Sequence, residues 1–82
     1  EILSAYRLIA AKEGIFVEPS SAAGLAGLLK YKKAGKLPQG KTIVITVTGH
    51  GLKDIPYALE AAKKPVIVPV NTKIAAKALG LA

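Results

Sequence analysis

Apolar residues recur at spacings of three and four over the first part of the chain, the pattern of a helix that buries one face. These residues are Ile2, Leu3, Tyr6, Ile9 and Ala10, and they predict an amphipathic helix that stops at Gly14, a residue that readily adopts the left-handed conformation of a helix end. Glu1 offers no clear N-cap, so we expect this helix to begin upstream of the sequence or to be cut at its first turn. A second helix is predicted over Ala22 to Ala34, where alanine and leucine are frequent. Ser20 and Ser21 precede this helix, and their hydroxyls are suited to capping its N-terminus.

Two shorter helices are predicted in the second half of the chain. Pro56 lies near the first turn of a helical stretch that reaches Lys63, and Asp54 precedes this stretch as a candidate cap. Asn71 can cap a last helix over Thr72 to Leu79, which Gly80 closes.

Consecutive apolar residues between these helices predict buried strands. Ile15 to Val17 is a very short one, and Thr42 to Val47 is the principal strand, of the kind found in parallel sheets covered on both faces. Val66 to Val68 lies between prolines, which confines it to an edge strand or an extended tail. The alternation of helices and strands predicts an α/β fold, a three-layer sandwich with a short parallel sheet, formed by residues 1–82 as a single segment.

The composition is that of a globular chain. Apolar residues make up 51% and charged residues 21%, which argues against disorder, and no apolar run approaches the roughly 20 residues of a membrane helix. The net charge of +7 raises the question of nucleic-acid binding. The lysines near the end of the second predicted helix favour its negative pole and lack interleaved aromatic or arginine residues, so we expect neither a nucleic-acid nor a membrane partner.

Two residue types are absent from the sequence. The lack of cysteine excludes disulfides and thiolate metal sites and is compatible with a reducing compartment, and we expect a cytoplasmic location. The lack of methionine means that the sequence contains no translational start, so we expect a processed, excised or trimmed chain.

The principal strand runs into Thr48 to Gly51, a Thr-Gly-His-Gly turn where backbone could approach a ligand closely. In open α/β sheets, ligands bind at this carboxyl end of the strands. His50 is the only histidine, so a histidine-rich metal site is excluded. It is either a general acid or base or, as we favour, a loop residue bonded to backbone. Glu18 and Asp54 are too few to predict a metal site or an acid/base pair.

Other motifs lack the context that their chemistry needs. Gly35 to Thr42 fits the phosphate-binding P-loop pattern, but a predicted helix precedes it and a strand follows, the reverse of a P-loop, so we expect no nucleotide hydrolysis. Ser20 and Ser21 do not lie in a nucleophile elbow. Nothing near Lys53 predicts the desolvated pocket of a Schiff-base lysine, so we expect a solvated side chain.

Two stretches closely resemble threonine synthases: Glu13 to Gly24, which contains Glu-Pro-Ser-Ser-Ala, and Thr46 to Asp54, which contains Gly-His-Gly-Leu-Lys-Asp. The opening and closing residues are similar to the end of that family too, so the resemblance covers nearly the whole chain. It implies the C-terminal part of the large domain of a pyridoxal 5'-phosphate enzyme with the tryptophan-synthase-β-like fold. The Glu-Pro-Ser-Ser-Ala string is shared in looser form with threonine and serine dehydratases.

The resemblance implies a place in the cofactor site for Thr48 and Gly49. The residue at the position of Thr48 in that family offers its hydroxyl to the pyridine nitrogen, and a hydroxyl donates without the negative charge that would hold a pyridinium proton. Gly49 and Gly51 would let the backbone pass close to the ring. The family's Schiff-base lysine has no counterpart in this chain, so the resemblance implies no catalytic residue in this segment.

The implied activity is that of a pyridoxal-phosphate-dependent lyase, which converts O-phosphohomoserine and water into threonine and phosphate. This activity needs the remainder of the threonine synthase chain, and dimers are usual in the family, so a homodimer is implied for the parent protein. A threonine or serine dehydratase is the alternative enzyme. A stand-alone small basic binding domain is an alternative of another class.

Overall fold

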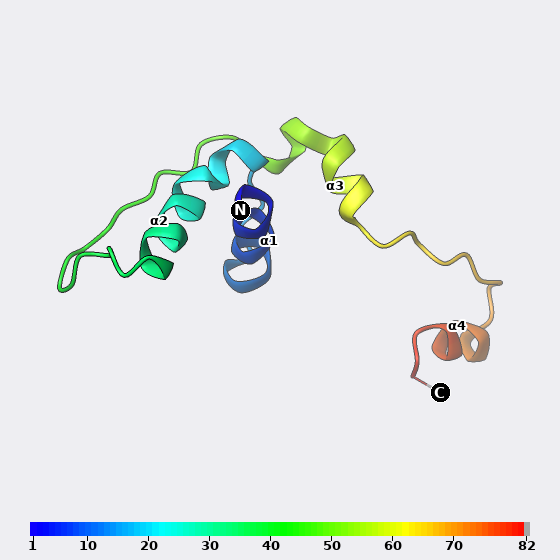
Figure 1. Ribbon diagram of the computed structural model, residues 1–82. Coiled ribbons are helices and arrows are strands. Elements are labelled where there is room, and N and C mark those ends of the chain that lie inside the picture. The colour runs from blue at the N-terminus through cyan, green and yellow to red at the C-terminus, as the bar shows by residue number, and fades with distance from the viewer. Residues whose placement is uncertain (82) are drawn as a thin grey trace.

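The computed structural model describes residues 1–81, and the regular structure in them is helical. The elements are α1 (Ile2–Glu13), the 3₁₀ helix η1 (Pro19–Ala22), α2 (Ala23–Lys33), the 3₁₀ helix η2 (Gly51–Asp54), α3 (Ile55–Ala61) and α4 (Thr72–Ala78). Figure 1 shows α1 beside α2, and a chain that then extends through α3 to a separate α4. The radius of gyration is 18.0 Å. A compact domain of this length would have a radius near 12 Å, so the segment is elongated.

Three of the predicted local signals at helix ends are confirmed, those of Gly14, Asp54 and Asn71. Gly14 follows α1 at φ 67°, in the left-handed region, and its N–H donates to the carbonyl of Ala10. The Asp54 carboxylate accepts a hydrogen bond from the N–H of Tyr57 at 3.4 Å. The Asn71 side chain accepts one from the N–H of Ile74 at 3.1 Å. Each of these contacts lies within four residues in the sequence, which is why the pattern alone predicts them.

The predicted serine caps are wrong. The residue that precedes η1 is Glu18, with no side-chain capping bond, and Pro19 occupies the first turn. Ala22 precedes α2, again without a side-chain cap. The Ser21 hydroxyl instead contacts the second half of the chain, as described below.

The predicted three-layer α/β sandwich is also wrong. Residues 1–81 contain no strand and no sheet, and the β pairing among them is an isolated antiparallel bridge between Val17 and His50. The segments predicted as the principal and edge strands are extended but have no neighbouring strand (Figure 1), and Val44 and Ile67 are 84% and 98% exposed. Backbone N–H and C=O groups form a sheet only with a partner strand, and an apolar β-branched run does not supply that partner by itself.

A small core holds the N-terminal half together. Its buried residues come from α1, η1, α2 and the segment between the first two elements: Ala5, Tyr6, Ile9, Val17, Ala22 and Ala26. The Tyr6 ring lies 6.3 Å from the Phe16 ring and 5.4 Å from the Tyr57 ring, centroid to centroid. Through these contacts Tyr6 of α1 links the segment after α1, which contains Phe16, to α3, which contains Tyr57.

The helices within residues 1–81 include none with the length and apolar character of a membrane span.

Candidate functional site

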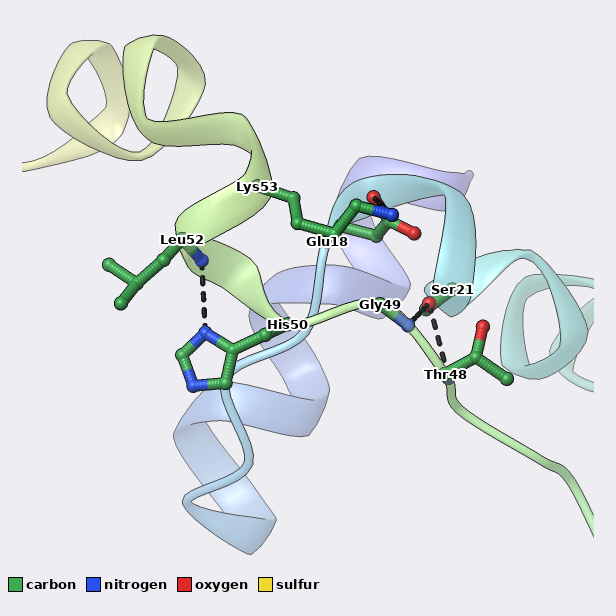
Figure 2. Close-up of polar contacts among 7 residues, drawn as sticks. All are labelled: Glu18, Ser21, Thr48, Gly49, His50, Leu52 and Lys53. Carbon is green, nitrogen blue, oxygen red and sulfur yellow. Dashed lines mark hydrogen bonds and ion pairs between the residues drawn. The ribbon is translucent and has the colours of Figure 1, made fainter.

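The two stretches that the sequence singles out lie against each other. Residues 16–21 and residues 48–53, which we call the paired loops, run antiparallel (Figure 2). The N–H of Glu18 donates to the carbonyl of Gly49 at 2.9 Å, and the N–H of Gly51 donates to the carbonyl of Phe16 at 3.1 Å. These backbone bonds attach the turn to the segment that leads into η1.

Ser21 adds a side-chain contact to this attachment. Its Oγ accepts a hydrogen bond from the N–H of Thr48 at 3.3 Å and another from the N–H of Gly49 at 2.8 Å (Figure 2). The partners are 27 and 28 residues apart in the sequence. The sequence pattern missed this contact because a serine before a helix is equally typical of a cap. The resemblance had nevertheless selected both stretches that the contact joins.

Gly49 and Gly51 are buried, and each makes room for a side chain of the other loop. A Cβ at Gly49 would overlap the Glu18 carboxylate, and a Cβ at Gly51 would overlap the Phe16 ring. The resemblance implies that these glycines let the backbone approach a cofactor ring. The structure supplies a second reason for them, which is the packing of the paired loops themselves.

Thr48 lies at the exposed edge of the paired loops. Its side chain projects away from the ring of His50 (Figure 2), and its hydroxyl has no hydrogen bond to any described residue. Both backbone polar groups of Gly49, by contrast, are already bonded within the paired loops. The hydroxyl is a neutral donor, which suits the pyridine nitrogen of pyridoxal phosphate, an acceptor. Thr48 therefore fits the implied cofactor through its side chain, and Gly49 has no unbonded polar group to offer.

His50 acts locally in the turn. Its Nδ1 accepts a hydrogen bond from the N–H of Leu52 at 3.1 Å, which places the His50 side chain as the cap of η2. The ring also contacts Phe16 edge to face, with 5.6 Å between centroids. This is the loop role that the sequence favoured for His50.

Lys53 forms an ion pair across the paired loops. Its Nζ lies 3.6 Å from Oε2 of Glu18, and the two side chains are 67% and 20% exposed. The pair is partly solvated, so its contribution to stability is small.

No group of histidine, cysteine, aspartate and glutamate side chains among residues 1–81 is arranged to hold a metal ion. The P-loop-like sequence lies at the end of α2 that points away from the paired loops (Figure 1).

Comparison with known proteins places this segment among pyridoxal-phosphate dependent enzymes. Residues 1–49 match the family described as pyridoxal-phosphate dependent enzyme. Relatives named threonine synthase are 51% identical over 82 residues in Mycobacterium bovis, 49% over 81 residues in Mycobacterium leprae and 48% over 82 residues in Synechocystis. They cover 100%, 99% and 98% of this chain, which corresponds to 23%, 22% and 21% of their own lengths.

The chain thus spans about a fifth of the length of the curated relatives it matches. The family match includes the whole of residues 16–21 and reaches Thr48 and Gly49 in the second of the paired loops. The match covers more than half of the sequence, and the chain belongs to the family of pyridoxal-phosphate dependent enzymes.

Proposed function

We propose that the chain is part of a threonine synthase and that it forms the pyridine-nitrogen side of the cofactor pocket. The full-length protein converts O-phosphohomoserine and water into threonine and phosphate. Relatives with that name align over 98% to 100% of the segment, which supports the assignment of the activity. The observation that carries the assignment of the site is the Thr48 hydroxyl, a donor without a partner among residues 1–81, on a turn held by backbone bonds.

Pyridoxal phosphate, when bound, supplies the electron sink that this chemistry requires. The role of Thr48 is to hold a proton at its Oγ1 and donate it in a hydrogen bond to the pyridine nitrogen. A neutral hydroxyl does not stabilise a protonated pyridine as a carboxylate would, so Thr48 moderates the electron-withdrawing strength of the ring. The buried glycines after Thr48 keep the turn packed on residues 16–18.

The other parts of the reaction belong to the remainder of the parent chain. The Schiff-base lysine, the loop that holds the cofactor phosphate and most ligands of the substrate phosphate lie outside this segment. Lys53 is paired with Glu18, which agrees with a structural role for this lysine. The active protein is a homodimer of full-length chains.

The test uses the full-length protein loaded with pyridoxal phosphate. We expect phosphate and threonine to appear in equal amounts from O-phosphohomoserine. In parallel, threonine and serine are supplied as substrates and formation of 2-oxo acids is measured. Rapid 2-oxo acid formation without phosphate release from O-phosphohomoserine would assign the protein to the dehydratases instead.

A third arm of the test addresses the basic charge of the segment. Binding of the full-length protein to a DNA duplex is titrated at low and at high salt. Lack of both enzyme activities, together with tight and salt-sensitive DNA binding, would point to the small basic binding domain and contradict the proposal.

A further inference from the structure

Ser21 contacts both peptide groups that flank the Cα atom of Thr48. The N–H of Thr48 belongs to the peptide plane before this Cα, and the N–H of Gly49 belongs to the plane after it. Only the torsions φ and ψ of Thr48 relate these two planes. One acceptor bonded to both N–H groups therefore restricts both torsions, and with them the direction of the Thr48 Cα–Cβ bond.

Among the described residues, Ser21 is the side chain whose contacts restrict the φ and ψ torsions of Thr48. The backbone bonds between the paired loops involve Gly49 and Gly51, on the C-terminal side of Thr48. On the N-terminal side, residues 42–47 are extended and pair with no strand among residues 1–81. Thr48 is thus the junction between an unpaired segment and a well-bonded turn, and Ser21 is the side chain that spans this junction.

Ser21 is itself held in place for this contact. Its N–H donates to the carbonyl of Glu18 at 3.0 Å, which closes a turn that contains Pro19. The proline ring fixes one backbone torsion of that turn. Ser21 is also half-buried, whereas its neighbour Ser20 is exposed. A serine oxygen has two lone pairs, and the bonds from Thr48 and Gly49 use both of them.

We propose that Ser21 is a positioning residue that orients the Thr48 hydroxyl toward the pyridine nitrogen of the cofactor. The inference rests on the proposed function, because it requires Thr48 to be the partner of that nitrogen. Ser21 acts through the Thr48 backbone and does not itself touch the cofactor. Its loss leaves the cofactor bound but lengthens or misaligns the hydrogen bond at the ring nitrogen.

The experiment uses the full-length protein reconstituted with pyridoxal phosphate that carries ¹⁵N in the ring. The ¹⁵N chemical shift reports the hydrogen bond at that nitrogen directly, and cofactor content, kcat and KM are measured on the same samples. The variants are Ser21→Ala, which removes the acceptor, and Ser21→Thr, which keeps it. Ser20→Ala is the matched control, since the hydroxyl that accepts from Thr48 and Gly49 is that of Ser21, and the Ser20 side chain has no hydrogen bond to residues 48–53.

We expect Ser21→Ala to move the ring ¹⁵N shift in the same direction as Thr48→Val, by a smaller amount. We expect kcat to fall roughly 10-fold with KM nearly unchanged, because misplacement of one donor is felt in the transition state. Ser21→Thr should restore both readouts, and Ser20→Ala should match the wild-type protein. If Ser21→Ala does not fold, Ser21→Cys replaces it, because a thiol has a similar shape and is a weak acceptor.

The double variant Ser21→Ala/Thr48→Val separates positioning from a general structural role. If Ser21 acts through Thr48, then Ser21→Ala adds no further ¹⁵N shift and no further loss of kcat in the Thr48→Val background. Equal losses in both backgrounds would overturn the inference. A wild-type ¹⁵N shift in Ser21→Ala, with a clear shift in Thr48→Val, would also overturn it and leave the proposed function standing. A wild-type ¹⁵N shift in Thr48→Val would instead contradict the proposed role of Thr48.

Discussion

The Glu18 carboxylate occupies the space in which a side chain at Gly49 would lie. The same two residues are joined through the backbone, where the N–H of Glu18 donates to the carbonyl of Gly49. The glycine and the glutamate therefore belong to one packed unit, and each restricts what the other position can hold.

Gly49→Ala should destabilise the protein, because the new methyl group must displace the Glu18 side chain or separate the paired loops. Overpacking of this kind costs about 1 to 3 kcal/mol of unfolding free energy. Chemical denaturation of the full-length protein measures the change. In a Glu18→Ala background the clash is removed, and the same substitution should cost much less. An equal cost in both backgrounds would show that Glu18 is not the obstacle.

Two glycines in α2 should respond differently to alanine. A Cβ at Gly27 meets no atom within 4 Å, so Gly27→Ala should raise stability by about 0.5 to 1 kcal/mol through helix propensity. A Cβ at Gly24 would lie 2.8 Å from Cγ2 of Ile45, and the strain should cancel or reverse that gain. Thermal unfolding of the two variants gives the comparison. Equal stabilisation by both would mean that Ile45 does not pack on α2 as described.

His50→Asn should be tolerated, because an asparagine oxygen can accept the hydrogen bond that the N–H of Leu52 now makes to Nδ1. His50→Ala removes the acceptor and should cost roughly 0.5 to 2 kcal/mol, as for loss of a helix cap. Unfolding and turnover are measured for both. A stable His50→Asn protein with no activity would contradict the loop role and indicate that the imidazole takes part in the chemistry.

Lys53→Met should change stability by only about 0 to 1 kcal/mol, because the ion pair with Glu18 is partly exposed. Any loss should disappear in concentrated salt, which screens the pair in the wild-type protein. Lys36→Met is the control, since Lys36 has no ion pair with the described residues. Turnover should remain at the wild-type level. A large loss of activity without a loss of stability would give Lys53 a chemical role.

Local signals predicted the helices well and the tertiary contacts poorly. Gly14, Asp54 and Asn71 act within four residues of their own positions, so their roles follow from the sequence alone. The apolar run at 42–47 has the composition of a strand, but a strand also needs a partner, and residues 1–81 do not provide one.

The candidate site was predicted in outline only. The resemblance selected both paired loops, yet no periodicity indicates that Ser21 contacts Thr48 across 27 residues. The packing that requires glycine at positions 49 and 51 could not be predicted from the sequence either, because it depends on the Glu18 and Phe16 side chains of a distant segment. The contacts of Thr48 and Gly49 with a cofactor remain predictions.

The most direct test of the account is turnover of O-phosphohomoserine by full-length Thr48→Val and Thr48→Ser, with cofactor content measured in the same samples. The valine has nearly the shape of threonine but no hydroxyl, and the serine keeps the donor. We expect both variants to hold a full complement of pyridoxal phosphate. Thr48→Val should lose roughly 10-fold or more in kcat, and Thr48→Ser should stay close to the wild-type value. Wild-type turnover by cofactor-loaded Thr48→Val would contradict the account.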